Sequence, residues 1–226
     1  MAISYPRPFP AGAYFGSGTA FRLLDLSVQK TLQAGAVQSI DLGPSLWTAT
    51  FQTVELQMRQ RQVWQAWELT LRGGRTFLAY DPEKQFPSAY STGVLSLTRA
   101  GGGTFDGTAI LASVTATSVS VTGLPAGYIA KVGDMLSFPW NNVHALHQIM
   151  EDATANGAGA ATFRVWPRVQ TTPAPAGGAA VRMVQPWCVM KIKPGTFSAP
   201  ASTSNSPTPV SFEGVQDISG KVLADF

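Results

Sequence analysis

The stretch that decides the fold spans residues 132–192 and contains VGDMLSF (132–138), HQIMED (147–152), ATFRVWP (161–167) and AVRMVQPWCVMKI (180–192). A glycine-rich turn at Ala155–Gly159 separates the second run from the third, and a Pro- and Gly-rich segment at Thr172–Gly178 precedes the last. Short apolar runs that end at Gly, Pro, Asn or Asp are typical of strands joined by tight turns. The stretch therefore predicts a small antiparallel β-module.

The N-terminal part of the chain has a mixed pattern. Leu46–Leu56 alternates between apolar and polar residues, which indicates a half-buried strand. A segment rich in Gln, Arg, Met, Leu, Ala and Glu follows, and it predicts a helix at about 57–72 that ends before Gly73 and Gly74. We expect the buried stripe of this helix to contain the residues at helical spacing, which are Val63, Ala66, Trp67, Thr70 and Leu71.

These patterns predict a mainly β protein with one α-helix, built from two units. Residues 1–95 and 197–226 form a β-sandwich-like domain, and residues 96–196 form an inserted antiparallel β-barrel or sandwich module. Insertion of a module is favoured where its two ends lie close together at an exposed loop. Residues 1–20 are rich in Pro, Gly, Tyr and Phe and predict an irregular arm, while the Ser- and Pro-rich stretch 197–209 predicts an extended loop.

Composition narrows the classes of function. Charged residues make up 13% of the 226-residue chain, about half the usual share, which suits a protein that buries much of its surface against neighbours. The net charge of +3 is scattered and gives no basic face for nucleic acid. No apolar run reaches the roughly 20 residues needed to span a bilayer. The N-terminus does not resemble a signal peptide, so we expect synthesis in the cytoplasm without a membrane anchor.

The sequence contains no convincing catalytic or metal-binding constellation. The single cysteine, Cys188, lies in an apolar run, and two histidines without clustered carboxylates do not make a metal site. Asp134 follows a glycine and is better explained as a turn residue than as a catalytic acid. Glu151 and Asp152 are neighbours on a predicted strand and point to opposite faces. We expect no catalytic residue, no cofactor and no metal, and therefore no enzyme.

Aromatic residues offer one alternative to catalysis. Most of the six tryptophans lie at core-facing positions of predicted elements, but Trp140 lies in FPWNN (138–142), which reads as a loop. Together with His144 and Tyr128, it defines a possible ligand or partner surface, because exposed aromatic rings stack on sugars. A carbohydrate-binding β-module for host-surface attachment is thus an alternative function. A depolymerase is a more distant one, since paired carboxylates on one face are missing.

The order of the features also resembles that of a known family. The strand with Trp47, the segment WQAWELTLRGG (64–74) and the strand FLAYDP (77–82) look like the N-terminal part of tail proteins of long-tailed bacteriophages. The Gly133-Asp134 strand, the strand 147–152, the glycine tip and the strand 163–168 are similar to a β-module of the same proteins. The resemblance covers about residues 45–82 and 128–193 and is to distal tail proteins.

The resemblance implies a structural function in the virion. A distal tail protein forms a ring, usually of six copies, that connects the tail tube to the tail tip or baseplate hub. The implied partners are further copies of the chain, the tail tube protein, the hub or tip proteins and the tape measure protein. The implied location is the distal end of the tail. No cofactor and no reaction are implied.

Overall fold

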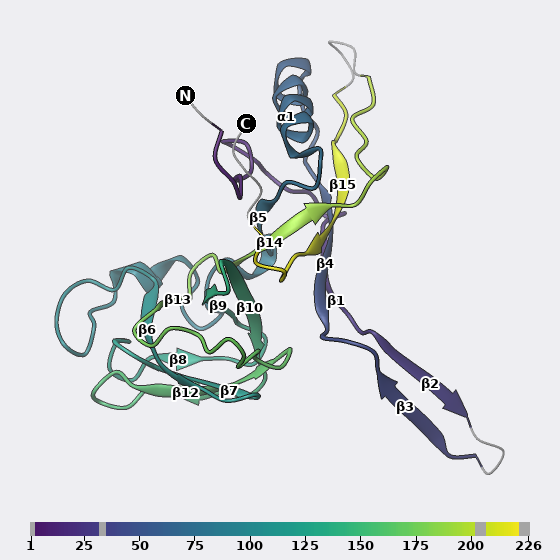
Figure 1. The fold of residues 1–226 in the computed structure, drawn as a ribbon. Helices are drawn as coiled ribbons and strands as arrows, with labels where there is room; N and C mark the ends of the chain where they lie inside the picture. The colour runs from purple at the N-terminus through teal and green to yellow at the C-terminus, as the bar shows by residue number, and fades with distance from the viewer. Residues whose placement is uncertain (1–2, 32–34, 202–206, 222–226) are drawn as a thin grey trace.

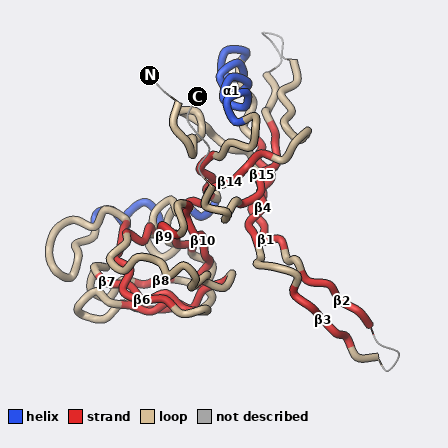
Figure 2. The backbone as a smooth tube through the Cα atoms, viewed as in Figure 1, coloured by secondary structure: helices blue, strands red, loops and turns tan. Residues whose placement is uncertain are grey.

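The computed structural model describes residues 3–31, 35–201 and 207–221. It contains a five-stranded sheet beneath a helix, a closed barrel, and a two-stranded hairpin that projects from the sheet (Figures 1 and 2). The expectation of a mainly β chain with one α-helix is confirmed. The first unit has a single sheet with a helix on one face, where the sequence had suggested two packed sheets.

The sheet of the first unit is antiparallel and has the order β1-β4-β15-β14-β5. Its strands are β1 (Ala20–Leu24), β4 (Leu46–Gln52), β15 (Ser211–Gln216), β14 (Trp187–Ile192) and β5 (Phe77–Tyr80). The predicted alternation in β4 is confirmed, because Trp47, Ala49 and Phe51 are buried. These side chains belong to a core rich in aromatic rings that also contains the buried residues of the helix.

Helix α1 (Met58–Leu71) packs on this core. Gln60 begins the helix by accepting a hydrogen bond from the backbone N–H of Gln57, at 3.0 Å. Gly73 and Gly74 follow the helix with positive φ angles that L-residues seldom adopt. The buried residues of α1 are Arg61, Trp64, Trp67 and Leu71.

The predicted stripe of α1 is therefore only partly correct. Trp67 and Leu71 are buried, but Val63 is 50% exposed and Ala66 is exposed as well. The buried face is rotated toward Trp64, because the large indole ring fills the space above Phe212 and Phe9, with ring centroids at 5.8 and 6.1 Å. Burial of the larger apolar surface decides the orientation of the helix.

The N-terminal arm is a packed element, contrary to the expectation of an irregular arm free of the core. Arg7 forms a parallel bridge with Phe77, in which the backbone N–H of Leu78 donates to the carbonyl of Arg7 at 2.8 Å. Phe9 contacts the rings of Phe51 and Phe77, with centroids at 5.2 and 5.6 Å. The arm thereby covers the β5 edge of its own sheet.

The second unit is a closed antiparallel barrel with the order β10-β12-β7-β6-β13-β9. Its strands are β6 (Thr108–Val114), β7 (Ser118–Thr122), β9 (Met135–Trp140), β10 (Val143–Ile149), β12 (Ala161–Trp166) and β13 (Ala180–Arg182). A short pair, β8 (Ile129–Ala130) and β11 (Ala153–Thr154), lies beside them. The barrel core includes Phe105, Phe138 and Phe163, each with no exposed surface.

Both predicted boundaries of the inserted module lie about ten residues too far along the chain. The predicted insert, 96–196, includes β14, but β14 pairs with β15 and β5 in the first sheet. It leaves out residues 86–95, which include most of the short 3₁₀ helix η2 (Ser91–Ser96), although Val94 is buried in the barrel core. The insert is better bounded by Gln85 and Gln185, because the N–H of Gln185 donates to the carbonyl of Gln85 at 2.6 Å. The two ends of the barrel thus meet. A second 3₁₀ helix, η1 (Pro82–Lys84), precedes this junction.

Strands β2 (Ser27–Thr31) and β3 (Val37–Asp41) form a hairpin that continues outward from the β1–β4 pair. In Figure 1 it points away from the sheet, the helix and the barrel. All of its residues from Val28 to Thr31 and from Val37 to Asp41 are exposed. Within the described ranges, no helix has the length and apolarity required to cross a bilayer.

Candidate functional site

The acidic side chains that the sequence analysis considered bind backbone N–H groups or lie beside basic side chains. Asp134 is 5% exposed, and its two carboxylate oxygens accept from the backbone N–H groups of Ser88 and Lys131, both at 2.9 Å. Glu151 lies 3.8 Å from Arg164, whereas Asp152 forms an ion pair with Lys131 at 2.7 Å. Asp134 is therefore a turn residue, and the adjacent carboxylates have separate partners.

The two histidines do not form a catalytic or metal-binding pair. His147 is 3% exposed, and its Nδ1–H donates to the carbonyl of Pro167 at 2.8 Å. Burial lowers the pKa of His147 to about 4, so the ring is neutral at pH 7. Burial also lowers the pKa of the partly exposed His144 and raises the pKa of the Cys188 thiol. Among residues 3–31, 35–201 and 207–221, no group of three potential metal ligands comes together.

The surface predicted from Trp140, His144 and Tyr128 is not formed. Tyr128 is 1% exposed and stacks on Tyr90 in the barrel core, with ring centroids 5.2 Å apart. Trp140 is 8% exposed, and its indole N–H donates to the carbonyl of Pro173 at 2.7 Å. The prediction failed because Trp140 is the last residue of β9 rather than a loop residue, so the pleat turns its ring inward. His144 is partly buried against Trp187.

One face of the hairpin is apolar near its base, and the other face is mainly polar. Residues directly opposite in an antiparallel pair share a face, and faces alternate along each strand. Because Val28 pairs with Ile40 and Lys30 with Gln38, the face that contains these residues also contains Leu26 and Leu42. Val28, Ile40 and Leu42 are 52%, 56% and 69% exposed. We call Leu26, Val28, Ile40 and Leu42 the apolar face of the hairpin, and Lys30 and Gln38 follow them toward its tip. The opposite face carries Ser27, Gln29, Thr31, Val37, Ser39 and Asp41.

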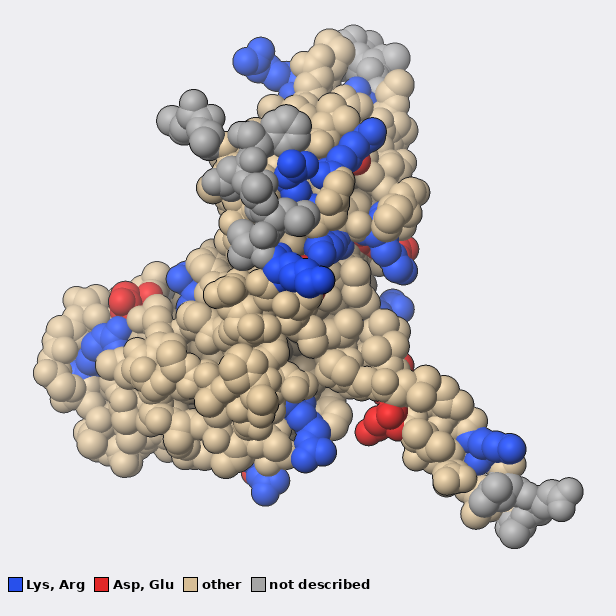
Figure 3. All heavy atoms as spheres, in the orientation of Figure 1, with Lys and Arg blue, Asp and Glu red and all other residues tan. Residues whose placement is uncertain are grey.

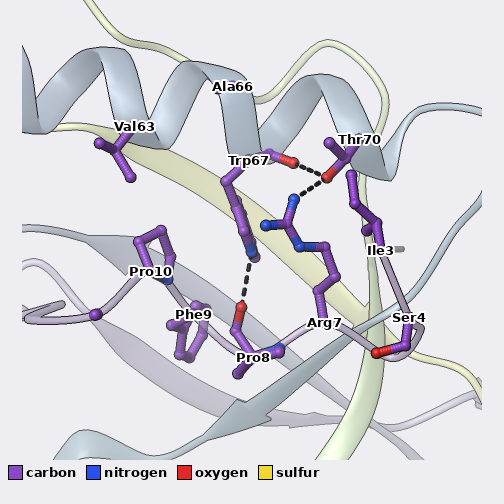
Figure 4. A pocket seen from close by; sticks show the side chains of 11 residues that line it. Ile3, Ser4, Arg7, Pro8, Phe9, Pro10, Val63, Ala66, Trp67 and Thr70 are labelled. Atoms are coloured by element: carbon purple, nitrogen blue, oxygen red, sulfur yellow. Dashed lines mark hydrogen bonds between the residues drawn. The ribbon is translucent and has the colours of Figure 1, made fainter. Parts of the chain in front are cut away.

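A second uncovered apolar surface lies between the arm and helix α1 (Figure 4). This groove, which we call the arm groove, has a volume of about 670 Å³ and is lined by Ile3, Ser4, Arg7, Pro8, Phe9, Pro10, Ala11, Val63, Ala66, Trp67 and Thr70. The indole N–H of Trp67 donates to the carbonyl of Pro8 at 2.8 Å, and Arg7 donates to the hydroxyl of Thr70. These bonds fix the arm at a set distance from the helix and hold the groove open.

The wall that helix α1 contributes to the arm groove explains the failure of the predicted stripe. Val63, Ala66 and Thr70 follow one another at helical spacing, but they face the groove rather than the core. Helix α1 thus has small or apolar residues on two sides, which is typical of a helix with a second contact surface. The hairpin was accessible to sequence analysis through the alternation at 36–42, whereas the groove depends on the path of the arm.

Charges are unevenly distributed between these two surfaces. In Figure 3 basic side chains gather around the helix end of the molecule, while acidic side chains lie at the base of the hairpin. Arg7 lines the arm groove, and Arg59 is exposed one helical turn before Val63 on the same side of α1. Asp25 and Asp41 stand at the base of the hairpin, and both are exposed. The groove end is basic and the hairpin base is acidic, while the exposed Lys30 places a cation nearer the tip of the hairpin.

No protein-family model matches the sequence, and no curated protein matches it. The chain carries two exposed apolar surfaces and few charged residues.

Proposed function

We propose that this protein is a structural component of a bacteriophage tail, which assembles with copies of itself into a ring at the distal end of the tail tube. The observation that carries the proposal is the presence of two separate uncovered apolar surfaces, the hairpin face and the arm groove, on one chain. Two different complementary patches produce heterologous contacts, which form a ring when the rotation closes. Six copies is the number that the family resemblance implies.

The distribution of polar groups supports a structural rather than a catalytic function. The buried polar side chains Asp134 and His147 both bind backbone atoms within the barrel, and Cys188 is buried in the sheet. Low charge over the whole chain suits a protein whose surface is largely covered in its assembly. In this proposal the ring binds the tail tube protein on one side and hub, tip or tape measure proteins on the other.

Cryo-electron microscopy of virions that contain this protein tests the proposal. The expected result is density for this chain in a closed ring around the channel, between the tube and the tip. Location in the capsid or at the ends of fibres would contradict the proposal, as would absence from the virion.

The alternative of a carbohydrate-binding module lacks the platform on which it was based, because the rings of Tyr128 and Trp140 lie in the barrel core. The exposed indole of the barrel is Trp166, at 43%. Titration of the protein with oligosaccharides, followed by tryptophan fluorescence, tests this alternative, and we expect no saturable change.

A further inference from the structure

We propose that the apolar face of the hairpin in one copy of this chain docks into the arm groove of the next copy. This inference rests on the proposed ring and names the two surfaces that form its contacts. It assigns a binding role to residues 26–42 and to the groove between the arm and helix α1.

The hairpin carries a sequence pattern that its own fold does not use. Alternation of apolar and polar residues stabilises a strand pair when one face is buried. Here Val28, Ile40 and Leu42 remain more than half exposed. An isolated two-stranded hairpin is only marginally stable in water. A contact that covers the apolar face would supply the missing burial.

The groove that receives the hairpin is on the same chain but out of its reach. The hairpin leaves β4 at Leu46, whereas helix α1 follows the opposite end of β4 after Gln52. Seven residues of strand span roughly 20 Å at about 3.3 Å per residue. The hairpin also points away from the helix and the arm (Figure 1). A contact between the hairpin and the groove therefore joins two copies.

The two surfaces match in chemistry. The groove presents Ile3, Pro10, Val63 and Ala66, and the hairpin presents branched aliphatic side chains of suitable size. Charged residues beside the groove are the cations Arg7 and Arg59, neither of which forms an ion pair with an acidic residue of the described chain. On the hairpin, the acidic Asp25 and Asp41 at the base outnumber the basic Lys30, so the hairpin is acidic on balance; the register places Asp41 on the face opposite Ile40 and Lys30 on the same face. Opposite charges guide association and exclude like-to-like pairing of grooves.

The first test places one carboxylate on either face of the hairpin in the full-length protein. Ile40→Asp puts a charge on the apolar face, and Ser39→Asp puts the same charge on the polar face of the same strand. Both positions are exposed, so neither change removes core packing. We expect Ile40→Asp to raise the concentration needed for half-assembly by at least ~10-fold, because an unpaired charge is costly to bury, while Ser39→Asp remains within about 2-fold of the wild type.

The second test places one carboxylate on the wall of the arm groove. Ala66→Asp places a carboxylate on the groove wall, and Gln65→Asp is the matched control on an exposed position of the same helix that does not line the groove. We expect only Ala66→Asp to weaken assembly. Analytical ultracentrifugation over a concentration series, together with circular dichroism to verify folding, provides the measurement.

Mixing the two defective variants tests the direction of the contact. Ile40→Asp retains an intact groove, and Ala66→Asp retains an intact hairpin. An equimolar mixture should give 1:1 dimers and nothing larger, while each variant alone stays monomeric. Dimers in the Ile40→Asp sample alone, or no complex in the mixture, would overturn the assignment.

Cross-linking identifies the contact directly. The natural thiol, Cys188, has no exposed surface, so introduced cysteines react without interference. A chain with Ile40→Cys and Val63→Cys should form a ladder of covalent oligomers with a short bismaleimide, and a chain with Ser39→Cys and Gln65→Cys should not.

The outcomes separate this inference from the proposed function. If the wild type assembles and all four aspartate variants assemble equally, the hairpin contact is wrong and the ring remains. If the variants behave as expected but assembly stops at open chains, the contact is right and the closed ring is wrong. A wild type that neither assembles nor cross-links at about millimolar concentration overturns the contact, whatever cryo-electron microscopy of virions shows. Assembly only after addition of a different tail protein, with cross-links to that protein, would assign the hairpin to that partner instead.

Discussion

Trp67 joins three parts of the first unit, since its ring contacts Phe77 of the sheet and Phe9 of the arm while its N–H binds the carbonyl of Pro8. It is 2% exposed. We expect Trp67→Ala to lower the free energy of unfolding by about 3–5 kcal/mol, the usual range for a buried aromatic. The control is Val63→Ala on the same helix, where a half-exposed side chain should cost under about 1 kcal/mol. Urea denaturation measures both, and equal losses would show that the orientation of α1 is wrong.

His147 gives the protein a pH dependence of stability with a defined sign. Its pKa is about 4 in the folded chain, because burial disfavours the charged ring, and near 6.5 when unfolded. Between these values the unfolded chain binds a proton that the folded chain does not. The stabilising contribution of the neutral His147 is fully present above pH 6.5 and decreases as the pH falls toward 4.

We therefore expect the free energy of unfolding to fall by about 2 kcal/mol more in the wild type than in His147→Asn between pH 7 and pH 5. This figure follows from the conversion of about 1.4 kcal/mol per unit of pKa shift. Asparagine keeps a donor for Pro167 but does not titrate in this range. Urea midpoints of both proteins at the two pH values measure the difference. Parallel pH profiles would exclude the buried, neutral histidine.

The N-terminal arm contributes more to the stability of the first unit than its Pro- and Gly-rich composition suggests. Phe9 contacts seven aromatic rings of the first unit, from Phe15, Phe51, Trp64, Trp67, Phe77, Tyr80 and Phe212. Phe9→Ala should destabilise the protein by about 2–4 kcal/mol, somewhat below the range for a fully buried ring. Tyr14→Ala, at a position 71% exposed in the same arm, is the matched control.

Hydrogen exchange gives a second measurement on the same element. The amide of Leu78 donates to the carbonyl of Arg7. Phe9→Ala should release the arm and increase exchange at Leu78, while amides between β14 and β15 stay protected. Unchanged protection at Leu78 would mean that the arm does not depend on Phe9 for its position.

At the scale of the whole molecule, the barrel is an insertion whose ends meet at Gln85 and Gln185. Replacement of residues 86–184 by a short Gly/Ser link should leave a folded sheet with α1, because all five strands remain. Replacement of residues 96–196 removes β14, the strand between β15 and β5, and should leave an unfolded or aggregated chain. Circular dichroism and gel filtration compare the two. If the chain without residues 96–196 folds and the chain without residues 86–184 does not, the predicted boundaries at 96 and 196 are correct.

Local patterns in the sequence determined the types of element and many of their limits. The alternation in β4, the Gly73-Gly74 end of α1 and the hydrogen bond from Lys131 to Asp134 all arise within a few residues. Backbone geometry and turn chemistry act over that range, so a single sequence contains them. The alternation of Ser39, Ile40, Asp41 and Leu42 in the hairpin belongs to the same class.

Tertiary structure alone decided which elements share a sheet and which faces are covered. β14 lies next to β13 in the sequence but joins a different sheet, and Trp140 is buried although its flanking residues are typical of a loop. Helix α1 has apolar residues on two sides, and only the positions of the arm and the sheet determine that Trp64 is buried and Val63 lines a groove. Burial is the sum of contacts between segments far apart in the chain, and periodicity within one segment does not specify those contacts.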